Sequence, residues 1–311
     1  MTGVRHLVLA VVAAVLALGL GLALGAGPVV GRSDARSASR ESTLSTRSAE
    51  LAARVDVLEQ SARTDAKVIT ALAGPLTDGR LAGRSVLIVR TPGASADLVR
   101  RTRASLLSAG AGITGELRIT RTYLDPAKAT APLEDLALRL VPPGVTFADG
   151  ASSIERVAAV LGRSTLSAEP PGETDQDAAE VIAGLTELGA VRLDGDPGRL
   201  AQLAVVLGGP TAGEPAKPAL VALVRALDSA GSGAVLAGAG RTSTLVGWAR
   251  DGAAGGASTV DGAQAQAGQV ALVLALAEQA AGQRGDYGTG AGTTSVLPVP
   301  APADGSAAPG D

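Results

Sequence analysis

An uncharged apolar run near the amino terminus constrains this chain more than any other feature. From Leu7 to Gly31 the sequence contains no charged residue, and a helix rising about 1.5 Å per residue crosses a hydrocarbon core of about 30 Å over that length. The run therefore predicts a single membrane-spanning anchor over residues 1–31. A cleaved export signal is the alternative, because Arg5 and His6 form a short polar head and small residues at 23–25 offer a cleavage point.

Charges beside the run do not settle which way the chain crosses the membrane. Arg32, Arg36 and Arg40 follow the run, whereas Arg5 precedes it. The positive-inside rule, applied literally, would place the rest of the protein in the cytoplasm. The residues alone therefore leave the topology open.

Residues 32–79 carry a mixed-charge pattern that predicts a helical coiled-coil stalk. Apolar residues recur there in alternating steps of three and four, which is typical of a heptad seam. Ser48 and Asp65 interrupt the seam, so we expect a short parallel homodimer and no long rod. An amphipathic helix folded back onto its own domain is the alternative. The principal seam residues are Leu44, Leu51, Val55 and Leu58.

Residues 80–288 alternate short apolar runs with helical patterns. The run Ser85–Arg90 is almost entirely apolar between Gly83 and Pro92, as expected of a strand buried on both faces. Behind the transmembrane helix and stalk, the sequence thus predicts a Rossmann-like, layered α/β body with a largely parallel sheet. Further strands are expected at Ile113–Tyr123, Ala201–Leu207 and Gly233–Ala237, and helices at Ala94–Ala109, Ser153–Leu161, Asp175–Leu188, Ala219–Ala230 and Gln269–Ala281.

Two segments without periodicity mark boundaries in this body. A Pro- and Gly-rich stretch at residues 169–173 is a point where the body could divide into two halves. Residues 289–311 are rich in Gly, Thr, Ala and Pro with almost no charge, so they bury too little surface to offset the entropy of ordering. We expect this tail to be disordered.

Composition excludes several kinds of chemistry. The sequence has no cysteine, and its single methionine and single histidine are Met1 and His6, so the body has no thiolate, thioether or imidazole for a soft metal or a Ser-His-Asp triad. The sequence therefore predicts no cofactor, no metal site and no enzymatic activity. A net charge of −3 without a basic block in the body gives no electrostatic basis for binding nucleic acid.

Two polar patterns in the body are candidate binding features. Asp261, Gln269 and Tyr287 could form a polar interaction edge, although Asp261 could equally cap or orient a helix beginning near Ala263. The Gly-Ala-Gly sequence starting at Gly238 follows an expected strand and is similar to part of a phosphate-binding loop, but it lacks the third glycine and a following lysine.

Several segments, in order and with matching spacing, resemble the mycobacterial copper transport protein B family of actinobacteria. They are Arg5-His6 before the apolar run, the heptad stalk, Leu81–Gly93, Ser258–Asp261, Gly268–Glu278 and Tyr287–Gly290. The resemblance implies an envelope protein linked to copper efflux or tolerance, described for the family as a channel-forming outer-membrane component. It also implies a single-pass protein with an exported body, which decides the orientation that the charges leave open. The resemblance identifies no catalytic or copper-ligating residue in this sequence.

Three functional hypotheses follow. The first is an anchored envelope protein that contributes to copper transport and homeostasis indirectly or through an envelope protein partner, because its body lacks soft ligands. The second is an envelope scaffold or assembly factor whose α/β body binds another protein and has no copper role. The third is an anchored domain that binds a nucleotide or sugar through the Gly238 loop.

Overall fold

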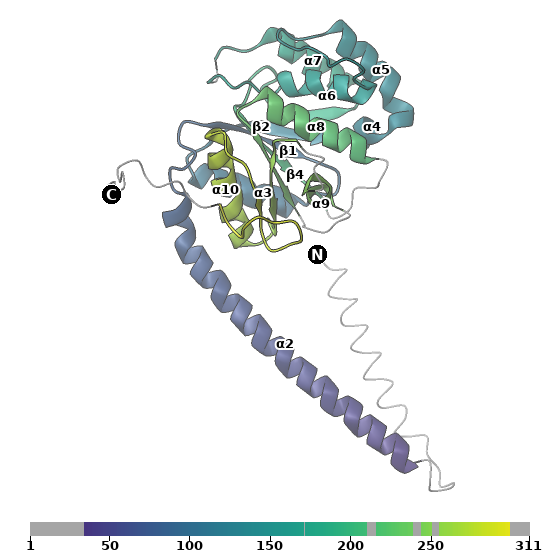
Figure 1. Cartoon of the computed structure of the whole chain (residues 1–311), viewed down its shortest axis with the longest axis vertical. Coiled ribbons are helices and arrows are strands. Elements are labelled where there is room, and N and C mark those ends of the chain that lie inside the picture. Colours follow the sequence, from purple (N-terminus) through teal and green to yellow (C-terminus); the bar gives the residue numbers. More distant parts are fainter. Residues whose placement is uncertain (1–33, 171, 210–215, 239–243, 251–254, 299–311) are drawn as a thin grey trace, which may run out of the picture. The chain divides into compact units, whose positions relative to one another are not determined.

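A computed structural model of the chain describes residues 34–170, 172–209, 216–238, 244–250 and 255–298 (Figure 1). The predicted anchor over residues 1–31 and the segment 239–243 of the Gly238 loop lie outside this description. Within the described residues, no helix is both long enough and apolar enough to cross a bilayer. The chain divides into two units, Met1–Arg63 and Thr64–Asp311, and each is described by itself.

Helix α2 (Asp34–Thr77) accounts for the described part of the first unit and runs into the second. Two ion pairs on its surface, Glu50–Arg54 and Glu59–Arg63, each join atoms 2.7 Å apart across one helical turn, a spacing that supports the helix modestly. The predicted stalk is thus helical. Pairing of its seam with a second chain stays a prediction.

The second unit is built on a seven-stranded sheet in the order β3-β2-β1-β4-β5-β6-β7. Figure 1 labels the neighbouring strands β2, β1 and β4. All neighbours are parallel except β2 and β3, which are antiparallel. A mixed α/β fold with a largely parallel sheet is thereby confirmed. The strands are β1 (Ser85–Arg90), β2 (Gly112–Ile119), β3 (Val191–Gly195), β4 (Leu203–Leu207), β5 (Ala234–Gly238), β6 (Ser258–Asp261) and β7 (Asp286–Tyr287).

Apolar side chains cover both faces of the sheet, which explains the nearly continuous hydrophobicity of its central strands. In β1, Val86 and Ile88 belong to one core and Leu87 and Val89 to the other. The first core lies under α3 (Ala96–Ser108) and α10 (Gln266–Ala280). The second lies under α4 (Arg121–Leu124), α5 (Pro126–Arg139), α6 (Ser153–Arg163), α7 (Gln176–Glu187), α8 (Lys217–Ala230) and α9 (Leu245–Trp248).

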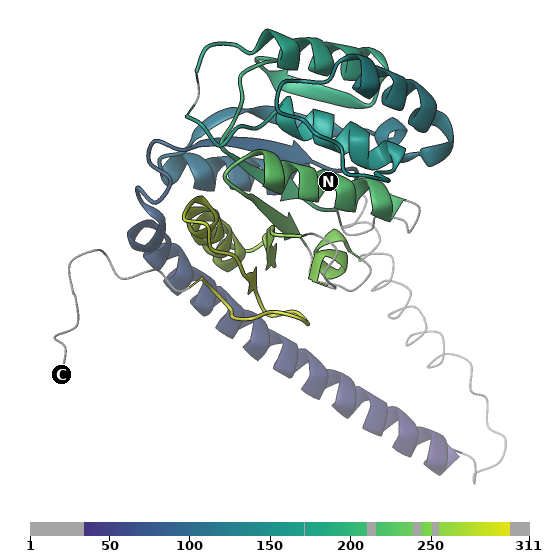
Figure 2. The same cartoon turned by 45° about the horizontal axis from the view of Figure 1, so that its top comes forward.

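On the second face the helices form more than one layer. Helix α8 contacts β4 and β5 and, on its other side, packs extensively against α6, so it lies between the sheet and α6 (Figure 2). The helices on either side of residues 169–173, α6 and α7, contribute to the same core. The segment 169–173 therefore does not separate two independent cores.

Two expectations are wrong at their boundaries. The strand expected over Ile113–Tyr123 ends at Ile119, because the Thr120 hydroxyl accepts the amide of Thr122 and starts the short helix α4. Residues 289–298, expected to belong to the disordered tail, are held on the body. Leu297 packs against the core, and the amides of Thr289 and Gly290 donate to Asp261. Residues 299–311 lie outside the described part.

The last turn of α2 is attached to the second unit. Ala73 is buried and Leu76 partly buried against Val270 and Leu274 of α10. Leu72, which falls between them on the helix, is about half exposed. The last turn of α2, which lies within the second unit, therefore packs on α10 through one face.

Candidate functional site

The carboxylate of Asp261, at the carboxyl end of β6, is saturated with hydrogen bonds. It accepts from Arg250 Nη1 at 2.7 Å, from the Thr289 amide at 3.0 Å and from the Gly290 amide at 2.9 Å. Burial raises the pKa of Asp261, but the bonds from Arg250 and the two amides outweigh it and leave that pKa below its usual value. The side chain is ionised near neutral pH and holds the segment after β7 against β6.

Arg250 is the cation that pairs with Asp261, and no pattern in the sequence identified it. Its side chain is only 3 % exposed. Besides Asp261, it donates Nε to Thr259 Oγ1 at 2.8 Å and Nη2 to the Tyr287 carbonyl at 2.7 Å. One guanidinium therefore ties two strands together. The only sequence signal for such a cation was Asp261 itself, an acid at the end of an expected buried segment, because a buried carboxylate needs a partner of opposite charge.

The three residues of the predicted interaction edge do not form one exposed surface. Tyr287 lies in the Asp261 network through its carbonyl, while its hydroxyl donates to Glu278. Gln269 lies on α10, where its Nε2 donates to the Ala263 carbonyl at 2.5 Å and to Thr102 at 3.3 Å. All three side chains are more than nine-tenths buried. Binding of a partner at this edge stays a prediction.

The alternative role for Asp261, capping a helix that begins near Ala263, is wrong. Helix α10 begins at Gln266, and its N-cap position is occupied by Ala265 without a side-chain cap. The carboxylate is instead committed to amides beyond β7. The family-like segments Ser258–Asp261 and Tyr287–Gly290 are thus joined directly by this side chain.

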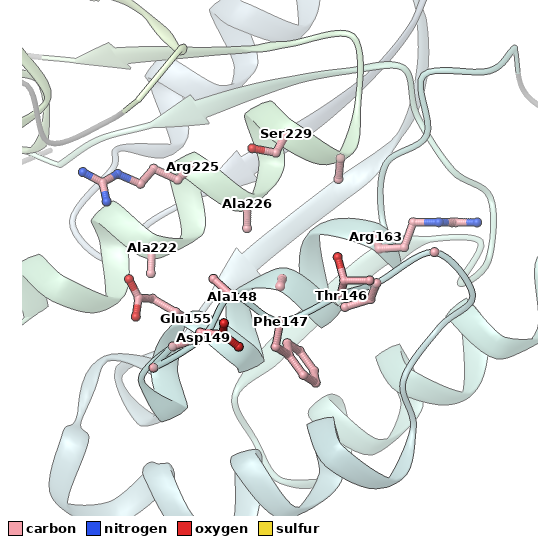
Figure 3. Close-up of a pocket in the computed structure, with 16 residues that line it drawn as sticks. Thr146, Phe147, Ala148, Asp149, Glu155, Arg163, Ala222, Arg225, Ala226 and Ser229 are labelled. Atoms are coloured by element: carbon pink, nitrogen blue, oxygen red, sulfur yellow. The ribbon is translucent and has the colours of Figure 1, made fainter.

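A pocket of about 640 Å³ lies between the loop 144–151, α6 and α8. Figure 3 shows Ala222 and Ala226 of α8 facing Ala148 of the loop across this pocket. The lining therefore combines small apolar side chains with charged residues, among them Asp149 and Arg225. Glu155, which also lines the pocket, is already bound to the amide and hydroxyl of Ser152 in a capping box.

The pocket exists where α6 and α8 approach closely at a glycine. A Cβ on Gly162 would lie 2.8 Å from the Ala226 carbonyl oxygen, so only glycine fits the crossing. At one end of the pocket Arg163 lies 3.5 Å from Asp175, which balances its charge. The lining of the pocket thus offers small apolar side chains together with charged groups of both signs.

At the point where a doubly wound sheet normally holds a ligand, the chain is tightly closed. The strand order reverses between β1 and β4, and their carboxyl ends would flank a crevice. Here a Cβ on Gly209 would lie 2.6 Å from the backbone of Gly93, and the Thr91 hydroxyl donates to the Leu207 carbonyl at 2.9 Å. The turns after the two strands pack directly on each other.

The sequence model of a family described as copper transport outer membrane protein, MctB, matches residues 1–298. The chain belongs to this family. Relatives named copper transporter MctB include one from Mycobacterium leprae, 29 % identical over 243 residues, covering 72 % of this chain and 76 % of the relative. Another, from Mycobacterium tuberculosis H37Rv, is 30 % identical over 230 residues, covering 70 % and 73 %.

Membership in the MctB family makes the ligand content of the body informative. Over the described residues, no three His, Cys, Asp or Glu side chains lie close enough together to hold a metal ion. Met1 and His6 lie outside those residues. The fold of this MctB-family chain thus presents an internal ion-pair network and a small-residue pocket, with no assembled copper centre in the described body.

Proposed function

We propose that this protein is a membrane-anchored cell-envelope protein that contributes to copper transport and copper homeostasis by an indirect, partner-dependent route. The observation that carries the proposal is the family match, which runs from residue 1 to residue 298. The indirect route is supported by the absence of cysteine from the sequence and of methionine and histidine from the body. Copper(I) prefers those soft donors, so a partner has to supply them.

We also propose that the protein crosses the membrane once and carries its body outside the cytoplasm. The uncharged run from Leu7 to Gly31 supports the anchor, and the family description as an outer membrane protein supports the envelope. A single cysteine introduced at exposed Asp196 and labelled in intact cells tests this topology. Labelling only after lysis would contradict it.

The stalk supports a further part of the proposal, a parallel homodimer. Leu51 and Leu58 are 61 % and 68 % exposed, and they repeat at a spacing of seven with β-branched Val55 between them, a combination that favours two parallel strands. In that register Arg54 and Glu59 occupy the positions that face each other across such a dimer. Arg54 would then meet Glu59 of the partner subunit, an opposite-charge contact that fixes both orientation and register.

Two measurements separate direct from indirect copper handling. In the first, the gene is deleted, and intracellular copper and growth are followed across a copper series; we expect copper to rise and growth to fall, with recovery on re-expression. In the second, purified full-length protein is titrated with copper(I) in the presence of a competing chelator, and we expect no stoichiometric binding. Tight binding by the protein alone would overturn the indirect route.

Unchanged copper content in the deletion strain would favour the alternative function. The protein would then be an envelope scaffold or assembly factor without enzymatic activity and without a copper role. The small-residue pocket beside Gly162 supports that alternative, because a depression of about 640 Å³ lined by both alanines and charged residues suits side chains of a protein partner. Cross-linking from a photoreactive residue at Ala148 would identify that partner.

A further inference from the structure

A pocket of about 280 Å³ lies at the amino-terminal end of β1 and β2. Arg84 and Ser85 line it from the start of β1, Thr114 from β2, and Arg199 from the turn before β4. Gly83 and Gly112 also line it, so no side chain from these two positions fills the space. The first residues of the segment Leu81–Gly93 therefore line this pocket, and the apolar residues that follow them form β1.

Charge in this pocket is unbalanced. Among the described residues, Arg84 and Arg199 line it and no acidic residue does. In the described part of the chain, the side chains of Arg84 and Arg199 take part in no ion pair or hydrogen bond, unlike Arg54, Arg156 and Arg250. Two arginines that line one concave space without a counter-charge among its lining residues produce a positive potential that an anion would neutralise.

Thr114 supplies an independent observation. Val86 pairs with Ile113 and Leu87 with Gly115, so Thr114 is an extra residue in β2, a β-bulge. Bulges redirect a side chain out of the regular alternation. The Thr114 Oγ1 atom is buried and has no hydrogen-bond partner among the described residues. Thr114 is also one of the residues that line the pocket, and rotation of its side chain toward an acceptor bound there would give this hydroxyl a partner.

Ser85 adds a second hydroxyl donor. Its Oγ accepts the amide of Gln202 at 2.9 Å, which orients the oxygen and leaves the hydroxyl hydrogen available. The described lining thus includes two arginines and two hydroxyl-bearing residues, and no carboxylate. This donor set matches the oxygens of a phosphate group, which arginine binds in a bidentate manner.

We propose that the pocket formed by Arg84, Arg199, Thr114 and Ser85 binds a phosphate group. The group belongs either to a free phosphate compound or to a phospholipid headgroup, since both present the same oxygens. This site is separate from the proposed copper role and does not depend on it. No bond is made or broken on the ligand; the site is one of binding.

Calorimetric titration of the purified full-length protein at constant ionic strength tests the proposal. One arm uses inorganic phosphate, and the other uses water-soluble dihexanoyl phosphatidylglycerol. We expect saturable binding in at least one arm, and the tighter arm identifies the source of the group. Arg84→Gln and Arg199→Gln should each weaken binding about tenfold or more, because each removes a charge-assisted contact.

Matched variants separate a specific site from general attraction. Thr114→Val keeps the shape of the side chain and should weaken binding by about threefold to tenfold, in line with the loss of one hydrogen bond. Arg192→Gln removes an exposed arginine from the neighbouring strand β3 and should leave binding unchanged. Circular dichroism verifies that each variant is folded. No saturable binding in either arm, or equal weakening by Arg192→Gln and Arg84→Gln, would overturn the proposal.

Discussion

Replacing Asp261 by alanine should destabilise the body more than any exposed substitution. The change leaves Arg250, whose side chain is 3 % exposed, without its anion. It also removes the acceptor for the amides of Thr289 and Gly290. Removing one partner of a buried, hydrogen-bonded ion pair costs about 3–5 kcal/mol of the free energy of unfolding. At about 2–4 °C per kcal/mol for a domain of this size, the midpoint should fall by about 6–20 °C.

A conservative variant and a surface control show whether the loss of stability comes from the lost charge of Asp261. Asp261→Asn keeps one acceptor oxygen but loses the charge, so its free energy of unfolding should lie between those of wild type and Asp261→Ala. Asp196→Ala removes an exposed aspartate on the same domain and should change the midpoint by less than about 2 °C. Thermal unfolding followed by circular dichroism measures all four proteins.

Hydrogen exchange reports the same contact locally. The amides of Thr289 and Gly290 are protected by Asp261 in the folded protein, so in Asp261→Ala they should exchange much faster than in wild type. Amides in β4, at the centre of the sheet, should be affected only through global unfolding. Unchanged exchange at residues 289 and 290, or a destabilisation below about 1 kcal/mol, would refute the reasoning.

The sign of the pH dependence follows from the lowered pKa of Asp261. A carboxyl whose pKa is lower in the folded than in the unfolded state binds fewer protons when folded, so its stabilising contribution is present above the unfolded value of about 3.9. That contribution is lost as the pH falls through the folded pKa. The difference in midpoint between wild type and Asp261→Asn should therefore shrink below about pH 4.

Three further predictions concern other parts of the chain. Gly162→Ala should lower the free energy of unfolding by about 1–3 kcal/mol, because the added Cβ forces α6 away from α8. Gly172 has open space around it, so Gly172→Ala should be nearly neutral in the same denaturant titration. Tyr123→Phe should be neutral or stabilising by up to about 1 kcal/mol, because the buried hydroxyl has no partner in the described residues; a clear loss of stability would reveal a hidden partner. Leu58→Asp should halve the mass seen by light scattering if the stalk pairs chains, and a wild-type protein that is already monomeric would contradict the homodimer.

Elements with strong local signals could be predicted from the sequence, and elements defined by distant contacts could not. The run Ser85–Arg90 is recognisable because six residues bounded by glycine and proline are nearly all apolar, and β1 has these same limits. Strand β3 (Val191–Gly195) mixes apolar, charged and small residues and faces solvent along much of its length, so its pattern resembles a loop. Helix α5 contains Pro132, which conceals it.

The residues of the candidate site show the same difference between local signals and distant contacts. Asp261 and Tyr287 stand out because polar or aromatic residues are uncommon beside apolar runs in this chain. Their connection through Arg250 could not be predicted, since the arginine comes from a segment without periodicity and acts on two strands at once. The Thr114 bulge was equally hidden, because a single extra residue in a strand pairing leaves no mark on the alternation of so short a segment.

The partner-dependent route can be tested by one substitution, because the soft ligands of this chain lie only at its amino terminus. Met1 and His6 are the only methionine and histidine in the sequence, and cysteine is absent, so a direct copper(I) contact through a side chain of this chain would have to involve the first six residues. His6→Ala, expressed in the deletion strain, removes the one imidazole and keeps the apolar run intact. We expect it to restore intracellular copper and growth as fully as wild type, because the partner supplies the ligands. Failure of His6→Ala to restore copper content, at equal protein abundance in the membrane fraction, would show that this chain contacts the metal itself.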